Sequence, residues 1–243
     1  MNFYAVIIGT EILNNRRTDK HFDFVREELA KYGHELFASF IIKDDDALMR
    51  RTYRMIQEDN EAIIFSFGGI GSTPDDLTRE IAAEIFEQTT AVAHKQFLQD
   101  IIDRFAEKAY PHRVHMAYLP PSADLIFNPV NNMSGFSLFN KYFFVPGFPS
   151  MAHPMIKDVI QTHFSKSIQK FRKTFTAHTS EETLITLMKT LPSSVELSCL
   201  PMFVNEKPHV ELSLSGVDEN EISSYFKTFT NELDKKNIYY KLT

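Results

Sequence analysis

The stretch that most constrains the fold of this chain is GGIGSTPDDLT, residues 68–78. An apolar run at 62–67 precedes it and predicts a buried strand, and apolar residues at helical spacing follow it and predict a helix. A strand, a glycine-rich turn and a helix start commonly hold a phosphate, because glycines let the backbone approach the anion and the first N–H groups of a helix lack partners. We therefore expect Gly68, Gly69, Gly71, Ser72 and Thr73 to bind a phosphate.

Two carboxylates lie inside this expected phosphate site, and phosphate repels aspartate. One interpretation is a divalent cation, Mg²⁺ or similar, held between the ligand and Asp75 and Asp76. The other is that the aspartates only stabilise the helix, with Ser72 or Thr73 as its N-cap and Pro74 in its first position. The spacing fits neither a Walker A loop nor a dinucleotide fingerprint. Local rules leave both interpretations open.

The first two-thirds of the chain alternates strand-like and helix-like patterns, which predicts an α/β domain with helices on both faces of a sheet. Strands are expected at 4–8, 35–42 and 62–67 and in a hairpin at 136–139 and 142–145, with helices at 21–32 (Phe22, Val25 and Leu29 inward), after 44–46, after the glycine turn, near 97–105 and at 151–164. Candidate site residues directly follow four of these strands: Gly9, Thr10 and Glu11; Asp44; the glycine turn; Pro146 and Gly147. Ligands of open α/β sheets bind beyond the carboxyl ends of the strands, so we expect one shared crevice.

The remainder of the chain has a different pattern. Strand-like and helical stretches follow one another as βαββαβ: 171–178, 180–191, 195–203, 209–215, 219–236 and 238–242. This order is the split βαβ plan of ferredoxin-like domains. We expect an α/β domain at 1–168, a small α+β domain at 169–243, and a linker at 166–173.

Composition restricts the function classes. The formal net charge is −6 and no Lys/Arg block stands out, which disfavours nucleic-acid binding. No stretch approaches the roughly 18 apolar residues of a membrane span, and the N-terminus does not resemble a signal peptide. The single cysteine, Cys199, allows no internal disulfide. We expect a cytoplasmic protein that binds a small phosphorylated ligand, forms a homo-oligomer and uses neither nucleic acid nor membrane.

The order of the motifs resembles a known family. GGIGSTPDDLT is similar to the GGxGxTxDDxT signature of the molybdopterin-binding (MoaB/Mog-like) superfamily, in particular its competence/damage-inducible CinA branch. Further matches are IGTEIL at 8–13 (the family's IGDEIL), Asp44 at a strand end, Asn128, Gly135, and VPGFPSM at 145–151 (the family's LPGxPxEM). The matches span residues 4–155, and the resemblance implies a three-layer α/β/α first domain followed by a small α+β domain.

The resemblance also implies activities. The CinA branch implies a metal-dependent ADP-ribose pyrophosphatase, and the Mog-like branch implies adenylyl transfer to molybdopterin, which is then a possible ligand. By matching positions, Asp76 corresponds to the catalytic aspartate of the loop and Asp44 to its partner. Cations that bridge carboxylate and phosphate oxygens would neutralise charge and position a water. Longer CinA proteins add a C-terminal amide-hydrolysing domain, which this sequence does not reach, so deamidase activity is not expected.

Some positions depart from the family pattern. Thr10 replaces the aspartate of IGDEIL, His21 stands where the branch often has Asn, and Ser150-Met151 lacks the glutamate of the last motif. These departures keep two alternatives open beside the enzyme: a non-catalytic ligand-binding or regulatory module, and a molybdenum cofactor biosynthesis protein.

Overall fold

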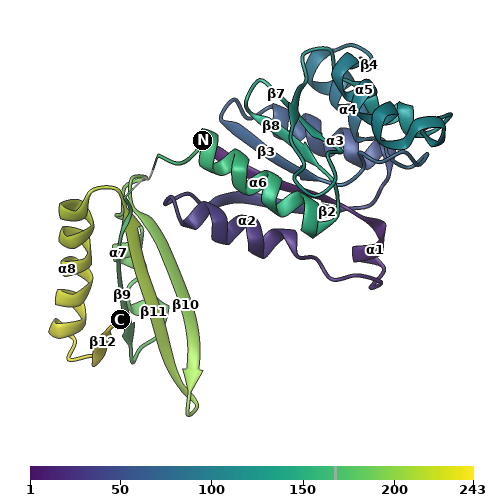
Figure 1. Cartoon of the computed structure of the whole chain (residues 1–243). Coiled ribbons are helices and arrows are strands. Elements are labelled where there is room, and N and C mark those ends of the chain that lie inside the picture. Colours follow the sequence, from purple (N-terminus) through teal and green to yellow (C-terminus); the bar gives the residue numbers. More distant parts are fainter. Residues whose placement is uncertain (167–168) are drawn as a thin grey trace. The chain divides into compact units, whose positions relative to one another are not determined.

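The computed structural model describes residues 1–166 and 169–243, and the chain divides into two compact units, Met1–Ser167 and Ile168–Thr243 (Figure 1). The expected linker at 166–173 falls partly on residues 167 and 168, which lie outside the described residues. Its last three residues already belong to the strand β9 (Phe171–Ala177) of the second unit.

Within residues 1–166 a six-stranded sheet forms the centre of the first unit. Its strands are β1 (Asn2–Ile8), β2 (Leu36–Ile42), β3 (Ala62–Phe67), β6 (Asp124–Ile126), β7 (Gly135–Leu138) and β8 (Tyr142–Val145). The spatial order is β2-β1-β3-β8-β7-β6, in which β2, β1, β3 and β8 are parallel and β7 is antiparallel to its neighbours. A separate short ribbon pairs β4 (Val92–Ala93) with β5 (Tyr118–Leu119).

Helices cover both faces of this sheet (Figure 1). They are α1 (Thr10–Leu13), α2 (His21–Ala30), α3 (Asp46–Gln57), α4 (Thr78–Glu87), α5 (Lys95–Phe105) and α6 (Pro149–His163), with short 3₁₀ turns η1 (Ala106–Ala109) and η2 (Arg113–Ala117). One hydrophobic cluster joins the sheet to α2 and α6, and a second joins it to α3, α4 and α5. The predicted three-layer α/β/α fold is confirmed.

The central strand β1 shows why the sequence folds in this way. Tyr4, Val6 and Ile8 belong to one cluster, whereas Phe3 and Ile7 belong to the other. A strand buried on both faces needs a continuous apolar run, as parallel strands between helical layers have. Because side chains alternate across the sheet, this one run supplies both cores.

One expected core residue of α2 is not buried. Phe22 is 40% exposed, and the guanidinium of Arg26 lies 5.8 Å from the centre of its ring. The buried stripe of α2 instead runs through His21, Val25 and Leu29, and Phe22 lies next to it on the helix. The polar residue His21 is thus buried in the core, where we expected the aromatic residue Phe22.

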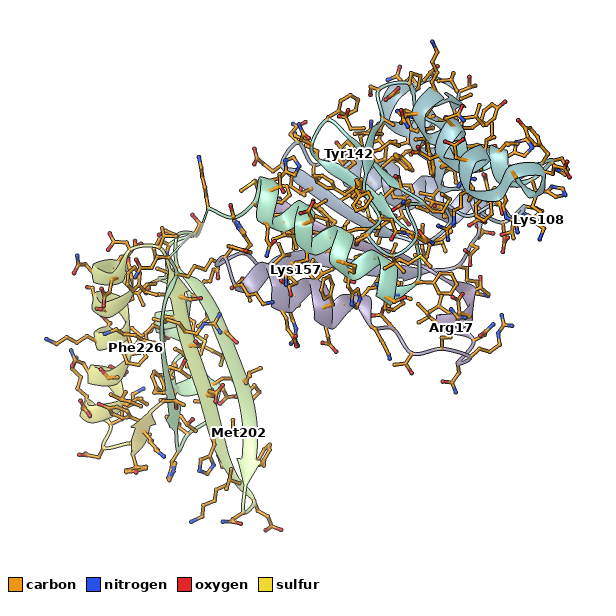
Figure 2. The ribbon with its side chains drawn as sticks, viewed as in Figure 1. Arg17, Lys108, Tyr142, Lys157, Met202 and Phe226 are labelled. Carbon is orange, nitrogen blue, oxygen red and sulfur yellow. The ribbon has the colours of Figure 1, made fainter. Side chains whose placement is uncertain are left out.

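The second unit is an antiparallel sheet with helices, and its order β10-β11-β9-β12 is that of a split βαβ fold. After β9 come η3 (Glu181–Thr183), α7 (Ile185–Met188), β10 (Glu196–Val204), β11 (Lys207–Gly216), α8 (Glu219–Lys235) and β12 (Tyr240–Leu242). Phe226 of α8, labelled in Figure 2, packs on Phe175 of β9 with ring centres 5.6 Å apart.

The first helix of this unit is much shorter than expected. The pattern at 180–191 predicts a helix of three turns, but α7 has four residues and a 3₁₀ turn precedes it. Thr183, Ile185 and Thr186 are β-branched, which lowers helix propensity. Leu184 is nevertheless buried in the core of the unit, as its spacing predicts. Among the described residues, no helix combines the length and apolar character needed to cross a membrane.

Candidate functional site

The four predicted segments lie at one edge of the first sheet. Strands β2, β1, β3 and β8 are parallel neighbours, so their carboxyl ends share this edge. The backbone N–H of Gly9 donates to Ile42 O at 3.0 Å, and that of Gly68 donates to Val145 O at 3.0 Å. These bonds join the segments after β1 and β3 to the ends of β2 and β8. The structure therefore places Gly9–Glu11, Asp44, the glycine turn and Pro146-Gly147 at one edge of the sheet.

Thr10 and Asp44 are in direct contact at this edge of the sheet. The backbone N–H and the hydroxyl of Thr10 both donate to Asp44 Oδ2, each at 2.8 Å, and the Asp44 N–H lies 3.3 Å from Thr10 Oγ1. Thr10, which stands where the family has an aspartate, thus donates a hydrogen bond to the carboxylate of Asp44. A carboxylate at position 10 could not make the hydroxyl bond and would repel Asp44.

The glycine turn is fixed to the start of α4. Gly68 and Gly69 have φ values of 99° and 67°, in the left-handed region that favours glycine. The hydroxyl of Thr78 donates to Gly68 O at 3.0 Å, and its N–H donates to Gly69 O at 3.0 Å. A Cβ on Gly69 would lie 2.2 Å from Thr78 Oγ1. Thr78 is completely buried and was not among the predicted site residues, although it ends the signature stretch.

The helix start was predicted wrongly. Neither Ser72 nor Thr73 is the N-cap and Pro74 is not helical, because α4 begins at Thr78 with Leu77 as its N-cap. The reason is a local turn: the N–H and hydroxyl of Thr73 donate to Asp76 Oδ2 at 2.7 and 2.6 Å. The Asp76 N–H also donates to Thr73 O at 3.0 Å, so residues 73–76 close as a turn. Asp76 is therefore not a residue that only supports the first turn of a helix.

Asp76 also depends on Gly71. A Cβ on Gly71 would lie 2.5 Å from Asp76 Oδ2, so only glycine allows the carboxylate this position. Asp75, the other predicted metal ligand, is exposed. Among the described residues, Asp76 and Asp44 make no contact with each other: Thr73 binds the first and Thr10 the second. The predicted pair thus lies at one sheet edge without touching.

The donor set limits how a metal could bind. Within residues 1–166 and 169–243, no three His, Cys, Asp or Glu side chains gather as a metal site. Magnesium typically uses one or two carboxylates and completes its shell with waters and substrate phosphates. Asp76 fits this pattern, because both bonds from Thr73 go to Oδ2 and the side chain is only half-buried. The residues fit a magnesium ion that arrives with a phosphorylated ligand.

His21 contacts the segment that follows β8, the last of the four at this edge of the sheet. Its Nε2 lies 3.2 Å from Gly147 O, and because a carbonyl can only accept, Nε2 carries the proton. Its ring stacks on Phe67, with ring centres 4.3 Å apart, and burial lowers the pKa of His21.

Arg17, labelled in Figure 2, contacts two residues of the predicted segments or next to them. Its guanidinium lies 5.4 Å from the ring centre of Phe148 and 3.9 Å from the carboxylate of Glu11. The side chain of Glu11 thus interacts with Arg17 rather than with either aspartate.

Asp76 faces a cleft of about 1060 Å³ that the sequence did not reveal. One wall comes from the glycine turn and the start of α4, and the other from the segment around η2. Arg79 lines this cleft and is almost fully buried, with a relative exposure of 7%. The predictions missed Arg79 because a charged residue after a helix start is usually solvated.

Comparison with known proteins agrees with this fold. A "CinA-like protein" of Acaryochloris marina is 31% identical over 158 residues, which cover 62% of this chain and 37% of the relative. A "CinA-like protein" of Flavobacterium psychrophilum is 25% identical over 241 residues, covering 92% of this chain and 56% of the relative. The chain thus spans about two-fifths to just over half of these relatives.

A solved structure gives the same result for the fold. The protein CinA from Thermoplasma acidophilum, described as of unknown function, aligns with a TM-score of 0.60 at 26% identity over 67% of this chain and 98% of that one. Residues 4–170 match the family described as "Probable molybdopterin binding domain", which is more than half of the chain. The chain therefore belongs to the molybdopterin-binding domain family, and it is similar to the CinA-like proteins of that family.

Proposed function

We propose that the crevice binds a phosphorylated nucleotide or pterin and that, with Mg²⁺, this chain hydrolyses the diphosphate of ADP-ribose. The observation that supports this most is a repeated arrangement. Asp44 and Asp76 are each held through Oδ2 by the N–H and the hydroxyl of one threonine, at 2.6–2.8 Å. Two fixed carboxylates beside a glycine turn are suited to chemistry at phosphorus, which depends mainly on positioning and charge.

Each residue has a role in this proposal. The backbone N–H groups of residues 69–72 bind the ligand phosphate, whereas the Thr73 N–H stays bonded to Asp76. Asp76 holds the magnesium ion, which supplies charge neutralisation when bound. Asp44, oriented by Thr10, accepts a proton from the attacking water. The water oxygen bonds to one phosphorus, the bridging P–O bond breaks, and the products are AMP and ribose 5-phosphate.

A second candidate is a binding or regulatory module without turnover. It is favoured by the lack of contact between Asp44 and Asp76 in the described residues, and by Ser150-Met151 in place of the family's glutamate. A role in molybdenum cofactor biosynthesis is a separate alternative, with molybdopterin as the ligand. In either case the phosphate would bind the same turn.

Release of AMP decides between the candidates. The full chain is incubated with ADP-ribose and MgCl₂, products are separated by chromatography, and the Asp76→Asn and Asp75→Asn variants are assayed in parallel. The enzyme proposal predicts AMP with the wild type and with Asp75→Asn, and a loss of at least about a hundredfold with Asp76→Asn. No AMP from the wild type, together with ADP-ribose or pterin binding by calorimetry, would establish the binding module instead.

A further inference from the structure

The cleft beside Asp76 has an unusual distribution of charge. Its walls are formed by Arg50, residues 72–74, 76, 77, 79, 80, 84 and 89–91, and by His112, Arg113, His115 and Tyr118. The glycine-turn residues Ser72 and Thr73 line the same cleft as Arg79, so an anion at the turn and one at Arg79 would share one continuous space. What occupies this space depends on which of its cations are already paired.

Two of the three arginines in the cleft have partners. Arg50 donates to Asp46 Oδ2 at 2.8 Å and also pairs with Glu84. Arg113 donates to Lys108 O at 2.5 Å, and its guanidinium lies 4.7 Å from the ring centre of Phe105. Both guanidinium groups are therefore occupied by the protein itself.

Arg79 differs from both. Its Nη1 is buried and has no hydrogen-bond partner, and within the described residues no carboxylate lies within ion-pair distance of its guanidinium. Asp76 and Glu80 act on it only through space, and the pKa of Arg79 is lowered chiefly by burial. Burying a guanidinium without a partner is unfavourable unless something compensates the charge. The compensating group is missing from the protein, although the arginine opens onto a cleft.

We propose that Arg79 binds one phosphoryl group of a diphosphate whose neighbouring phosphoryl group lies at the glycine turn. The inference rests on the proposed function and narrows its ligand class to diphosphates rather than monophosphate esters. The planar fork of a guanidinium matches two oxygens of a phosphate. Asp76 and Arg79, both on the wall formed by the glycine turn and the start of α4, would present a negative and a positive charge to the ligand, with magnesium at the carboxylate. Arg79 binds in this proposal and takes no proton.

Calorimetry with inorganic phosphate and with pyrophosphate tests this proposal on the full chain. The wild type should bind pyrophosphate more tightly than phosphate, in the presence of Mg²⁺. Arg79→Met should weaken pyrophosphate binding at least about tenfold and phosphate binding much less, because it removes a charge-assisted bond to the second phosphoryl group only. Arg50→Met is the matched control: it removes a cation of the same cleft that is already paired, and should leave the preference for pyrophosphate in place.

Thermal unfolding without ligand supplies a second readout. Removing an unpaired buried charge should leave the melting temperature of Arg79→Met equal to or above that of the wild type, whereas Arg50→Met, which breaks ion pairs, should melt lower. If Arg79→Met does not fold, Arg79→Lys decides: it keeps the charge without the fork and should bind pyrophosphate with intermediate affinity.

Two results would overturn the proposal. Equal pyrophosphate affinity in the wild type and in the folded Arg79 variant excludes the contact and leaves the binding function of the glycine turn intact. A wild type that does not prefer pyrophosphate over phosphate excludes the diphosphate site. The assay of AMP release then judges the proposed function separately.

Discussion

Thr10 donates two hydrogen bonds to one oxygen of Asp44, from its backbone N–H and from its hydroxyl, both at 2.8 Å. Thr73 makes the same pair of bonds to Asp76 on the neighbouring segment. Both aspartates therefore point one oxygen at the protein, which fixes the direction of the other. The departure of Thr10 from the family's aspartate is thus compatible with an ordered Asp44.

Thr10→Val is expected to lower the free energy of unfolding by about 1–2 kcal/mol, because Asp44 Oδ2 and the Asp44 N–H both lose the hydroxyl. AMP release or ligand affinity should fall as Asp44 loses its orientation. Urea unfolding and calorimetry measure the two effects. Thr18→Val, at an exposed threonine of the same segment, should change neither. Equal behaviour of the two variants would show that Thr10 does not hold Asp44.

Gly71→Ala tests the close approach of Asp76. The added methyl group would lie 2.5 Å from Asp76 Oδ2, so the carboxylate must leave Thr73. We expect ligand affinity to fall about tenfold or more, with a loss of stability below about 2 kcal/mol, because the turn is at the surface. Pro74→Ala, at an exposed position of the same turn, is the control. Unchanged Mg²⁺-dependent binding of ADP-ribose by Gly71→Ala would contradict a role for the position of Asp76.

Stability should depend on pH through His21. Burial lowers its pKa in the folded state, and burial also lowers that of His153, whose ring centre lies 5.3 Å away. In the unfolded chain the histidine has its ordinary pKa of about 6.5, so as the pH falls it binds a proton there before it does so in the folded protein. Protonation therefore favours the unfolded state, and the protein loses stability as the pH falls below about 6.5. The slope for one group is at most about 1.4 kcal/mol per pH unit. Urea unfolding between pH 7.5 and 5.5 measures it.

Replacing the histidine isolates its contribution. His21→Asn introduces the residue that the family pattern often has, and it should flatten the pH dependence while retaining a donor for Gly147 O. His163→Asn, at an exposed histidine that ends α6, serves as the control and should keep the wild-type slope. If the stability of His21→Asn changes with pH as steeply as that of the wild type, another group is responsible for the pH dependence.

Much of the first unit could be predicted because its signals are local and repeated. Apolar runs such as 62–67 give the buried strands, and the motifs after them lie at the shared carboxyl edge of those strands. The start of α4 could not be predicted, because a Thr-x-x-Asp pattern permits both a helix cap and the closed turn that Asp76 makes with Thr73. Which one forms depends on Thr78, whose bonds to the glycine turn arise only in the tertiary structure.

Arg79 and the cleft could not be predicted for a related reason. The wall that faces Arg79 comes from residues 112–118, over thirty positions away in a region of 3₁₀ turns without periodic pattern. A sequence gives no sign that an arginine near a helix start will be covered by such a segment. Likewise, His21 and Phe22 are adjacent, and only the packing of α2 against α6 decides which of them is buried.

The second unit provides the last prediction, that it can be disrupted without loss of the site. Phe226 is 8% exposed and contacts Phe175 across the core formed by α8 and the sheet. Phe226→Ala should cost this unit about 3–5 kcal/mol, enough to unfold a domain of this size. Ligand affinity should remain, because every residue proposed for the site lies in Met1–Ser167. Limited proteolysis measures the unfolding of the second unit, and calorimetry on the same sample measures ligand affinity. Phe203→Ala, at a 79% exposed aromatic of β10, is the control. Loss of ligand binding in a sample whose first unit stays resistant to protease would show that the second unit contributes to the site.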